Sequence, residues 1–224
     1  MKSLLRLMAW LSPSFPVGSF AYSHGLEYAV EAGLIRDLPQ ALDWVSTVLR
    51  DGGARLDADL FLAAYDAQSD QELDAVVDLA DAWRGTSELA QESAAQGAAF
   101  LLAVAAAWPD PWLELWKARL KTTDRRPAYC VAVAVAAKRA GIAAEDALAA
   151  FLHASCANLV SALVRLVPLG QTDGQRAMAA MEPLVEQAVA AALARPPADR
   201  GACVPVLDWC SMSHETQYTR LFRS

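Results

Sequence analysis

Apolar side chains recur along most of the chain at intervals of three and four residues, which places them on one face of an α-helix. One periodic segment follows Asp37, which we predict to cap a helix, with Gln40 reaching back to the helix start. Ser69 and Glu72 form a capping box ahead of a second periodic segment that ends before Gly85. The pattern therefore predicts two amphipathic helices in the first half of the chain.

The middle of the chain continues the helical pattern. Asp110 followed by Pro111 predicts a helix start, because proline is tolerated in the first helical turn. The preceding helix, from about 87 to 107, is expected to let a neighbouring helix, in this chain or in a second copy, approach closely. Its seam of small side chains consists of Ala90, Ala94, Gly97 and Ala98.

Residues 131–135 alternate valine with alanine, which is typical of a strand. Lys138, Arg139 and Gly141 instead indicate a helix end. Because a lone strand would leave its backbone groups unpaired, we predict a buried helix here.

Two long helices are expected next, over 145–167 and from 172 to about 194. We predict that Thr172 and Gln175 form a capping box at the start of the second, and that Pro183 kinks it. The last stretch, 196–224, is expected to be an extended tail with at most a short helix near 208–212. The sequence thus predicts an all-α, single-domain bundle of residues 1–224 with roughly eight to ten helices.

Composition narrows the class of protein. A net charge of −7 without a basic stripe argues against nucleic-acid binding. The four cysteines form no C-x-x-C pair, so we expect reduced, mostly buried thiols. Arg6 interrupts the apolar N-terminal run, and we expect no apolar run to reach the length needed to span a membrane. We expect a cytoplasmic protein that does not contact a membrane.

The chain offers little for catalysis. Its three histidines, His24, His153 and His214, form no H-x-x-x-H pair, and no glycine loop ends in the G-K-[ST] that binds phosphate. His153 and Cys156 can share a helix face, which a buried helix explains as well as a site does. We expect no catalytic residue, no cofactor and no stable metal site.

Two segments differ from the rest of the sequence. Residues 13–27, PSFPVGSFAYSHGLE, combine prolines, glycines, aromatics and hydroxyls over a length unusual for a connecting loop. Residues 213–224, SHETQYTRLFRS, hold arginine and aromatic side chains up to the last residue, and these residue types anchor protein interfaces.

These segments carry a resemblance to a known family. Residues 12–27, SPSFPVGSFAYSHGLE, resemble the N-terminal signature of urease accessory protein F. SALVRLVPLGQTDGQ at 161–175 and SMSHETQYTRLFRS at 211–224 resemble its central and C-terminal signatures, and RGTSELAQE at 84–92 is also similar. The resemblance covers nearly the whole chain, in the right order.

The resemblance implies an all-helical, dimeric, non-enzymatic scaffold. Such a protein would bind accessory protein D (also called H), recruit the GTPase accessory protein G, and act with them on apo-urease, where nickel insertion follows GTP hydrolysis. One alternative is a regulator that supplies Arg220, Arg223 or Arg165 to the GTPase. Another is a metallochaperone with its own nickel site. His24 and His214 are the candidate transient nickel ligands.

We expect residues 213–224 to fold onto 13–27 or onto a partner, with Phe222 as the apolar anchor. The candidate partner-binding residues are Phe20, Tyr22, Ser23, His24, Glu27, Arg165, Gln171, His214, Glu215, Tyr218, Arg220, Phe222 and Arg223.

Overall fold

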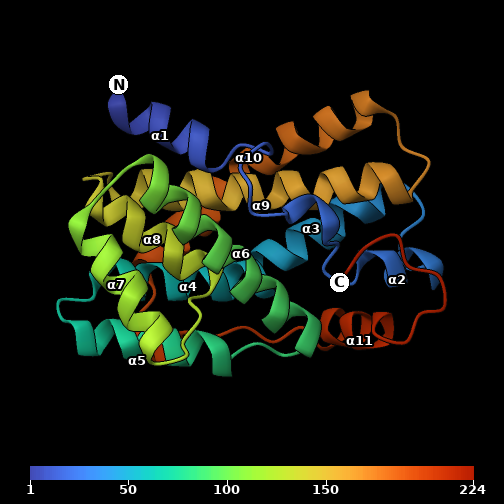
Figure 1. Ribbon diagram of the computed structural model, residues 1–224. Coiled ribbons are helices and arrows are strands. Elements are labelled where there is room, and N and C mark those ends of the chain that lie inside the picture. The colour runs from blue at the N-terminus through green and yellow to red at the C-terminus, as the bar shows by residue number, and fades with distance from the viewer.

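The computed structural model describes residues 1–224 and contains only helices and connecting segments (Figure 1). The all-α prediction is confirmed, although eleven α-helices exceed the predicted range. The elements are α1 (Lys2–Trp10), η1 (Ser19–Ala21), α2 (Leu26–Glu31), α3 (Leu38–Arg50), α4 (Gly53–Asp66), α5 (Asp70–Ala82), α6 (Ser87–Ala107), α7 (Pro111–Thr122), α8 (Tyr129–Arg139), α9 (Ala144–Leu166), α10 (Gln171–Ala194), η2 (Pro197–Asp199) and α11 (Pro205–His214).

Side-chain caps fix several helix starts where the sequence predicts them. The Asp37 carboxylate accepts the Gln40 amide at 3.0 Å, and the Gln40 side chain reaches back to the preceding turn. The Ser69 hydroxyl accepts the Glu72 amide at 3.2 Å. Asp110 caps α7 by accepting two backbone amides at 2.9 and 3.0 Å. Each cap pairs backbone donors that the first helical turn leaves free.

The predicted capping box of α10 is wrong. The helix begins at Gln171 after Gly170, so Thr172 lies inside the first turn and caps nothing. Pro183 lies within the same helix, which continues to Ala194. The helix survives because proline removes only one hydrogen bond and twenty-four residues supply many others.

Helix α8 lies at the centre of the bundle, packed against α4, α6 and α9. Positions 130–137 are all buried, so the alternating segment is the predicted helix rather than a strand. The small residues of α6 bring it close to the α8 start: a Cβ on Gly97 would lie 2.0 Å from the Pro127 carbonyl oxygen. Part of the predicted small-residue seam therefore serves packing within this chain.

Helices α9 and α10 are long and apolar enough to cross a membrane by length and composition, with mean hydropathies of 1.7 and 1.2. The expectation that no run has this length is therefore wrong. The two helices pack on each other, and α9 also contacts α3, α4 and α8. Half of the apolar stretch of α9 and 28% of that of α10 are buried inside the protein.

The C-terminal tail is more ordered than predicted. It contains η2 and the ten-residue α11, and the final residues return to α2, so that the chain ends beside the N-terminal half of the bundle (Figure 1). Phe222 and Ser224 are buried. All four cysteines are free, and Cys203 is the exposed one.

Candidate functional site

The last residues pair with the loop between α1 and α2 through the backbone. The Ser23 amide donates to the Ser224 carbonyl at 2.8 Å, and the Arg223 amide donates to the Ala21 carbonyl at 2.8 Å. The Ser23 hydroxyl also donates to the Ser224 carbonyl. The predicted contact between residues 213–224, the tail, and residues 13–27, the N-terminal segment, is therefore confirmed within the chain.

A left-handed turn brings the N-terminal segment against α11. His24 and Gly25 have φ values of 56° and 75°, a region that non-glycine residues seldom adopt. A Cβ on Gly25 would lie 2.7 Å from the Ser211 backbone nitrogen, so only glycine fits this approach. Ser211 in turn shares a 2.7 Å hydroxyl hydrogen bond with Thr86 at the start of α6.

Glu27, in the first turn of α2, is the centre of the tail contact. Its two carboxylate oxygens accept the Leu221 amide at 2.6 Å and the Phe222 amide at 2.9 Å. The same carboxylate lies 3.2 Å from Nε2 of the fully buried His214. A buried carboxylate is stabilised only when donors replace its water, and here the tail supplies two backbone amides.

Two further carboxylates, Glu88 and Glu92 on α6, complete the contact and are absent from the predicted residues. Glu88 lies 2.8 Å from Nδ1 of His214 and accepts from Arg220 at 3.0 Å. Glu92 accepts from the Ser224 hydroxyl at 2.7 Å and from Gln96 at 2.7 Å. Three polar side chains at intervals of four, in a helix otherwise rich in alanine, were the signal that could have revealed this face.

The candidate nickel ligands His24 and His214 are both engaged by carboxylates. His24 Nε2 lies 2.8 Å from Glu92. Burial lowers the pKa of His24, but the charge and hydrogen bond of Glu92, together with the charge of Asp57, outweigh burial and leave that pKa raised. No three His, Cys, Asp or Glu side chains converge in a way that could hold a metal ion.

Arg165, in the last turn of α9, joins the same assembly. Its guanidinium lies 3.7 Å from the ring centre of Phe20 and 4.3 Å from that of Phe222.

Glu215 accepts from the Ser87 hydroxyl at 2.7 Å. Gln171 is exposed at the first residue of α10 and takes no part in this hydrogen-bond network.

The docked tail presents an exposed face of aromatic, aliphatic and cationic side chains. Tyr218 is fully exposed, and the side chains of Phe20 and Leu221 are exposed by 65% and 66%. Arg220 and Arg223 are also exposed. A hollow of about 500 Å³ opens on this face, lined by Tyr22, Glu88, Gln91, Arg220, Phe222 and Arg223.

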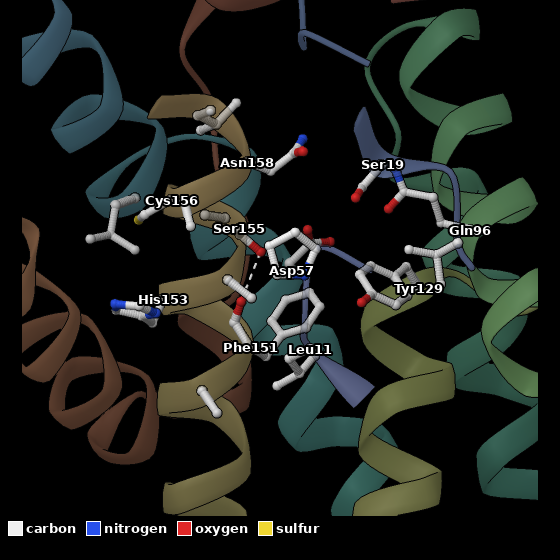
Figure 2. A pocket seen from close by; sticks show the side chains of 18 of the residues that line it. Leu11, Ser19, Asp57, Gln96, Tyr129, Phe151, His153, Ser155, Cys156 and Asn158 are labelled. Carbon is white, nitrogen blue, oxygen red and sulfur yellow. Dashed lines mark hydrogen bonds between the residues drawn. The ribbon is translucent and has the colours of Figure 1, made fainter. Parts of the chain in front are cut away.

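A second cavity of about 760 Å³ lies between α1, α6 and α9, and Figure 2 shows the polar groups Asp57, Gln96 and Tyr129 around it. Asp57 pairs with Arg84 at 2.6 Å within this cavity.

Burial raises the pKa of the Cys156 thiol to about 12, so that thiol stays protonated and is a weak nucleophile near neutral pH. His153 is exposed while Cys156 is buried, so the two form no pair.

Comparison with known proteins identifies relatives over the full length. The UreF family model matches residues 35–182. The urease accessory protein UreF of Granulibacter bethesdensis is 47% identical over 99% of this chain and 94% of its own length. The UreF proteins of Mesorhizobium japonicum and Magnetococcus marinus are 48% and 43% identical, over 99% of this chain and 96% and 98% of their own lengths. These alignments extend over the N-terminal segment and the tail as well as the helical core.

Proposed function

Because the chain belongs to the UreF family of urease accessory proteins, we propose that it is a non-enzymatic scaffold for loading nickel into urease. In this role it bridges accessory protein D (H) and the GTPase accessory protein G, so that GTP-dependent nickel insertion can proceed on apo-urease. Nickel is the cargo of this assembly. We also propose that the protein works in the cytoplasm as a homodimer.

The observation that best supports this proposal is the docked tail. Backbone pairing, Glu27 and two carboxylates of α6 hold the tail in one place, while Tyr218, Leu221 and Arg223 point their side chains outward. A flexible tail would lose conformational entropy on binding a partner, and a docked tail has already lost it. Aromatic and arginine side chains on a fixed backbone are suited to protein recognition. We therefore assign recruitment to this face, the recruitment surface.

Deletion of residues 220–224 tests the proposal directly. In a pull-down with accessory proteins D and G, with and without GTP, the full chain should retain both partners and the truncated chain should lose protein G. The helical content should change little, because the deleted residues lie outside the helices. The melting temperature should fall, because the deletion removes the buried ring of Phe222 and the donors that pair with Glu27 and Glu92. The matched control is Arg176→Gln, which removes an exposed arginine whose ion pair is local to α10. Normal urease activation by the truncated chain at equal expression would contradict the proposal.

The exposure of Arg223 supports the alternative function, in which the protein regulates the partner GTPase by supplying an arginine. Arg165 is stacked between two rings and Arg220 is paired with Glu88, whereas Arg223 is exposed and forms no ion pair. If Arg223 acts on the GTPase, Arg223→Lys should lower stimulated GTP hydrolysis by about 10³-fold without loss of binding. An unchanged hydrolysis rate in the assembled complex would exclude this role.

A further inference from the structure

Arg165 links three parts of the chain that are distant in sequence. It belongs to the last turn of α9, where its Nε donates to the Ser161 carbonyl at 3.1 Å. Its Nη1 donates to the Phe20 carbonyl at 2.9 Å, in the N-terminal segment. Its guanidinium also faces the ring of Phe222, in the tail. One side chain thus contacts α9, the N-terminal segment and the tail together.

The two rings hold the guanidinium between them. Phe20 is 65% exposed, whereas Phe222 is only 4% exposed, so the cation lies over one ring at the surface and one ring that is buried. Both rings present to the cation the face on which a cation is attracted by the ring quadrupole. A planar guanidinium can stack on two rings at once, which the compact ammonium of lysine does poorly.

The hydrogen bonds of Arg165 do not by themselves account for its position. Its Nη2 is buried and has no hydrogen-bond partner. Burial lowers the pKa of Arg165, although an arginine side chain stays charged at any pH the protein experiences. The aromatic rings therefore supply contacts that offset part of the lost hydration of the cation.

We propose that Arg165 is the positioning residue of the recruitment surface, clamping the N-terminal segment and the tail through a guanidinium stacked between Phe20 and Phe222. This inference rests on the proposed function for its purpose, but the clamp itself is a property of the isolated chain. Arg165 makes these contacts within its own chain and acts by holding the tail in place, so it is not the arginine that reaches a GTPase.

Hydrogen exchange of the isolated protein tests the clamp. The amides of Ser23 and Arg223 report tail docking, because each donates across the contact. Arg165→Gln should speed their exchange by about fivefold, and amides in α8 should exchange as before. Arg165→Lys should fall between wild type and Arg165→Gln, because it keeps the charge and loses the planar stack. Arg176→Gln is the matched control and should match wild type.

The outcomes separate clear alternatives. If the Ser23 and Arg223 amides of Arg165→Gln exchange at the wild-type rate, the clamp is overturned. If amides throughout α8 and α9 exchange faster by the same factor, the clamp is also overturned, because Arg165 would then have a general structural role. If Arg165→Gln does not fold, the same exchange measurement on Phe20→Ala tests the clamp, because this variant removes one exposed ring and leaves α9 intact. Faster exchange of the same two amides in Phe20→Ala supports the clamp, and unchanged exchange overturns it.

The partner assay distinguishes this inference from the proposed function. If wild type recruits accessory protein G and Arg165→Gln recruits about fivefold less while its tail exchanges faster, both ideas are supported. If wild type recruits no partner but the exchange result holds, the proposed function fails and the clamp stands. If Arg165→Gln recruits normally with an undocked tail, the positioning role is overturned.

Discussion

The two halves of α6 hold their neighbours by different physical means. The second half carries Phe100 and Val104, both buried, and Gly97 lets the start of α8 come within backbone contact. The first half carries Glu88 and Glu92, which bind the tail through hydrogen bonds and ion pairs. One helix therefore belongs both to the main core and to the recruitment surface.

Apolar packing and the tail contact respond differently to a single substitution. Apolar packing is shared among many side chains, so its loss is felt across the whole core. The tail is held by a few directional bonds and one buried ring, that of Phe222, and removal of one acceptor leaves several buried donors unpaired. The tail can thus open while the core stays folded, and single substitutions should separate the two events.

The largest effect is expected in the core half of α6, from Gly97→Ala. The added Cβ meets the Pro127 carbonyl, which cannot move without shifting the start of α8. Chemical denaturation should show a loss of about 3 kcal/mol in the free energy of unfolding. Gly53→Ala is the matched control, because its Cβ would meet nothing within 4 Å, and it should be neutral. Equal stability of the two variants would mean that α6 and α8 are not closely packed.

A smaller effect, confined to the tail, is expected from Glu27→Gln. The amide presents only one oxygen to the two backbone donors of Leu221 and Phe222, so tail docking should weaken by about 2 kcal/mol. Exchange of the Leu221 and Phe222 amides measures this directly. The exposed Glu182→Gln is the control and should leave exchange unchanged. Comparable acceleration in core helices would remove the distinction between the two regions.

The smallest effect is a pH dependence from His24. Because its pKa is raised in the folded protein, the pairing with Glu92 stabilises the fold at low pH and is lost as pH rises through that pKa. The side chain is about one-third exposed, so His24→Gln should cost only a few tenths of a kcal/mol more at about pH 5.5 than at about pH 8.5. His153→Gln, at an exposed histidine, is the control. An equal cost at both pH values would contradict the pairing.

Local signals in the sequence predicted much of the fold and less of the site. Asp37, Ser69 and Asp110 act through neighbours in sequence, so their caps could be predicted. The start of α4 has no capping side chain, so no local signal in the sequence predicts this helix. The N-terminal segment and the tail were identified by their unusual residue types.

The partners of these segments could not be predicted in the same way. Glu88 and Glu92 act across more than one hundred residues of chain, and the sequence does not state which helix a buried tail will meet. The sequence predicts Arg165 as a site residue, but its contacts with two rings depend on the three-dimensional approach of three segments.

The central claim is that the docked tail is the surface that recruits the GTPase accessory protein. The most direct test is to measure the affinity of the wild type, Glu27→Gln and Tyr218→Ala for accessory protein G in the presence of accessory protein D, with tail exchange followed in the same samples. We predict that Tyr218→Ala keeps a docked tail and binds about tenfold more weakly, whereas Glu27→Gln loses both docking and binding. Wild-type affinity in Glu27→Gln, with its tail shown to be undocked, would contradict the account.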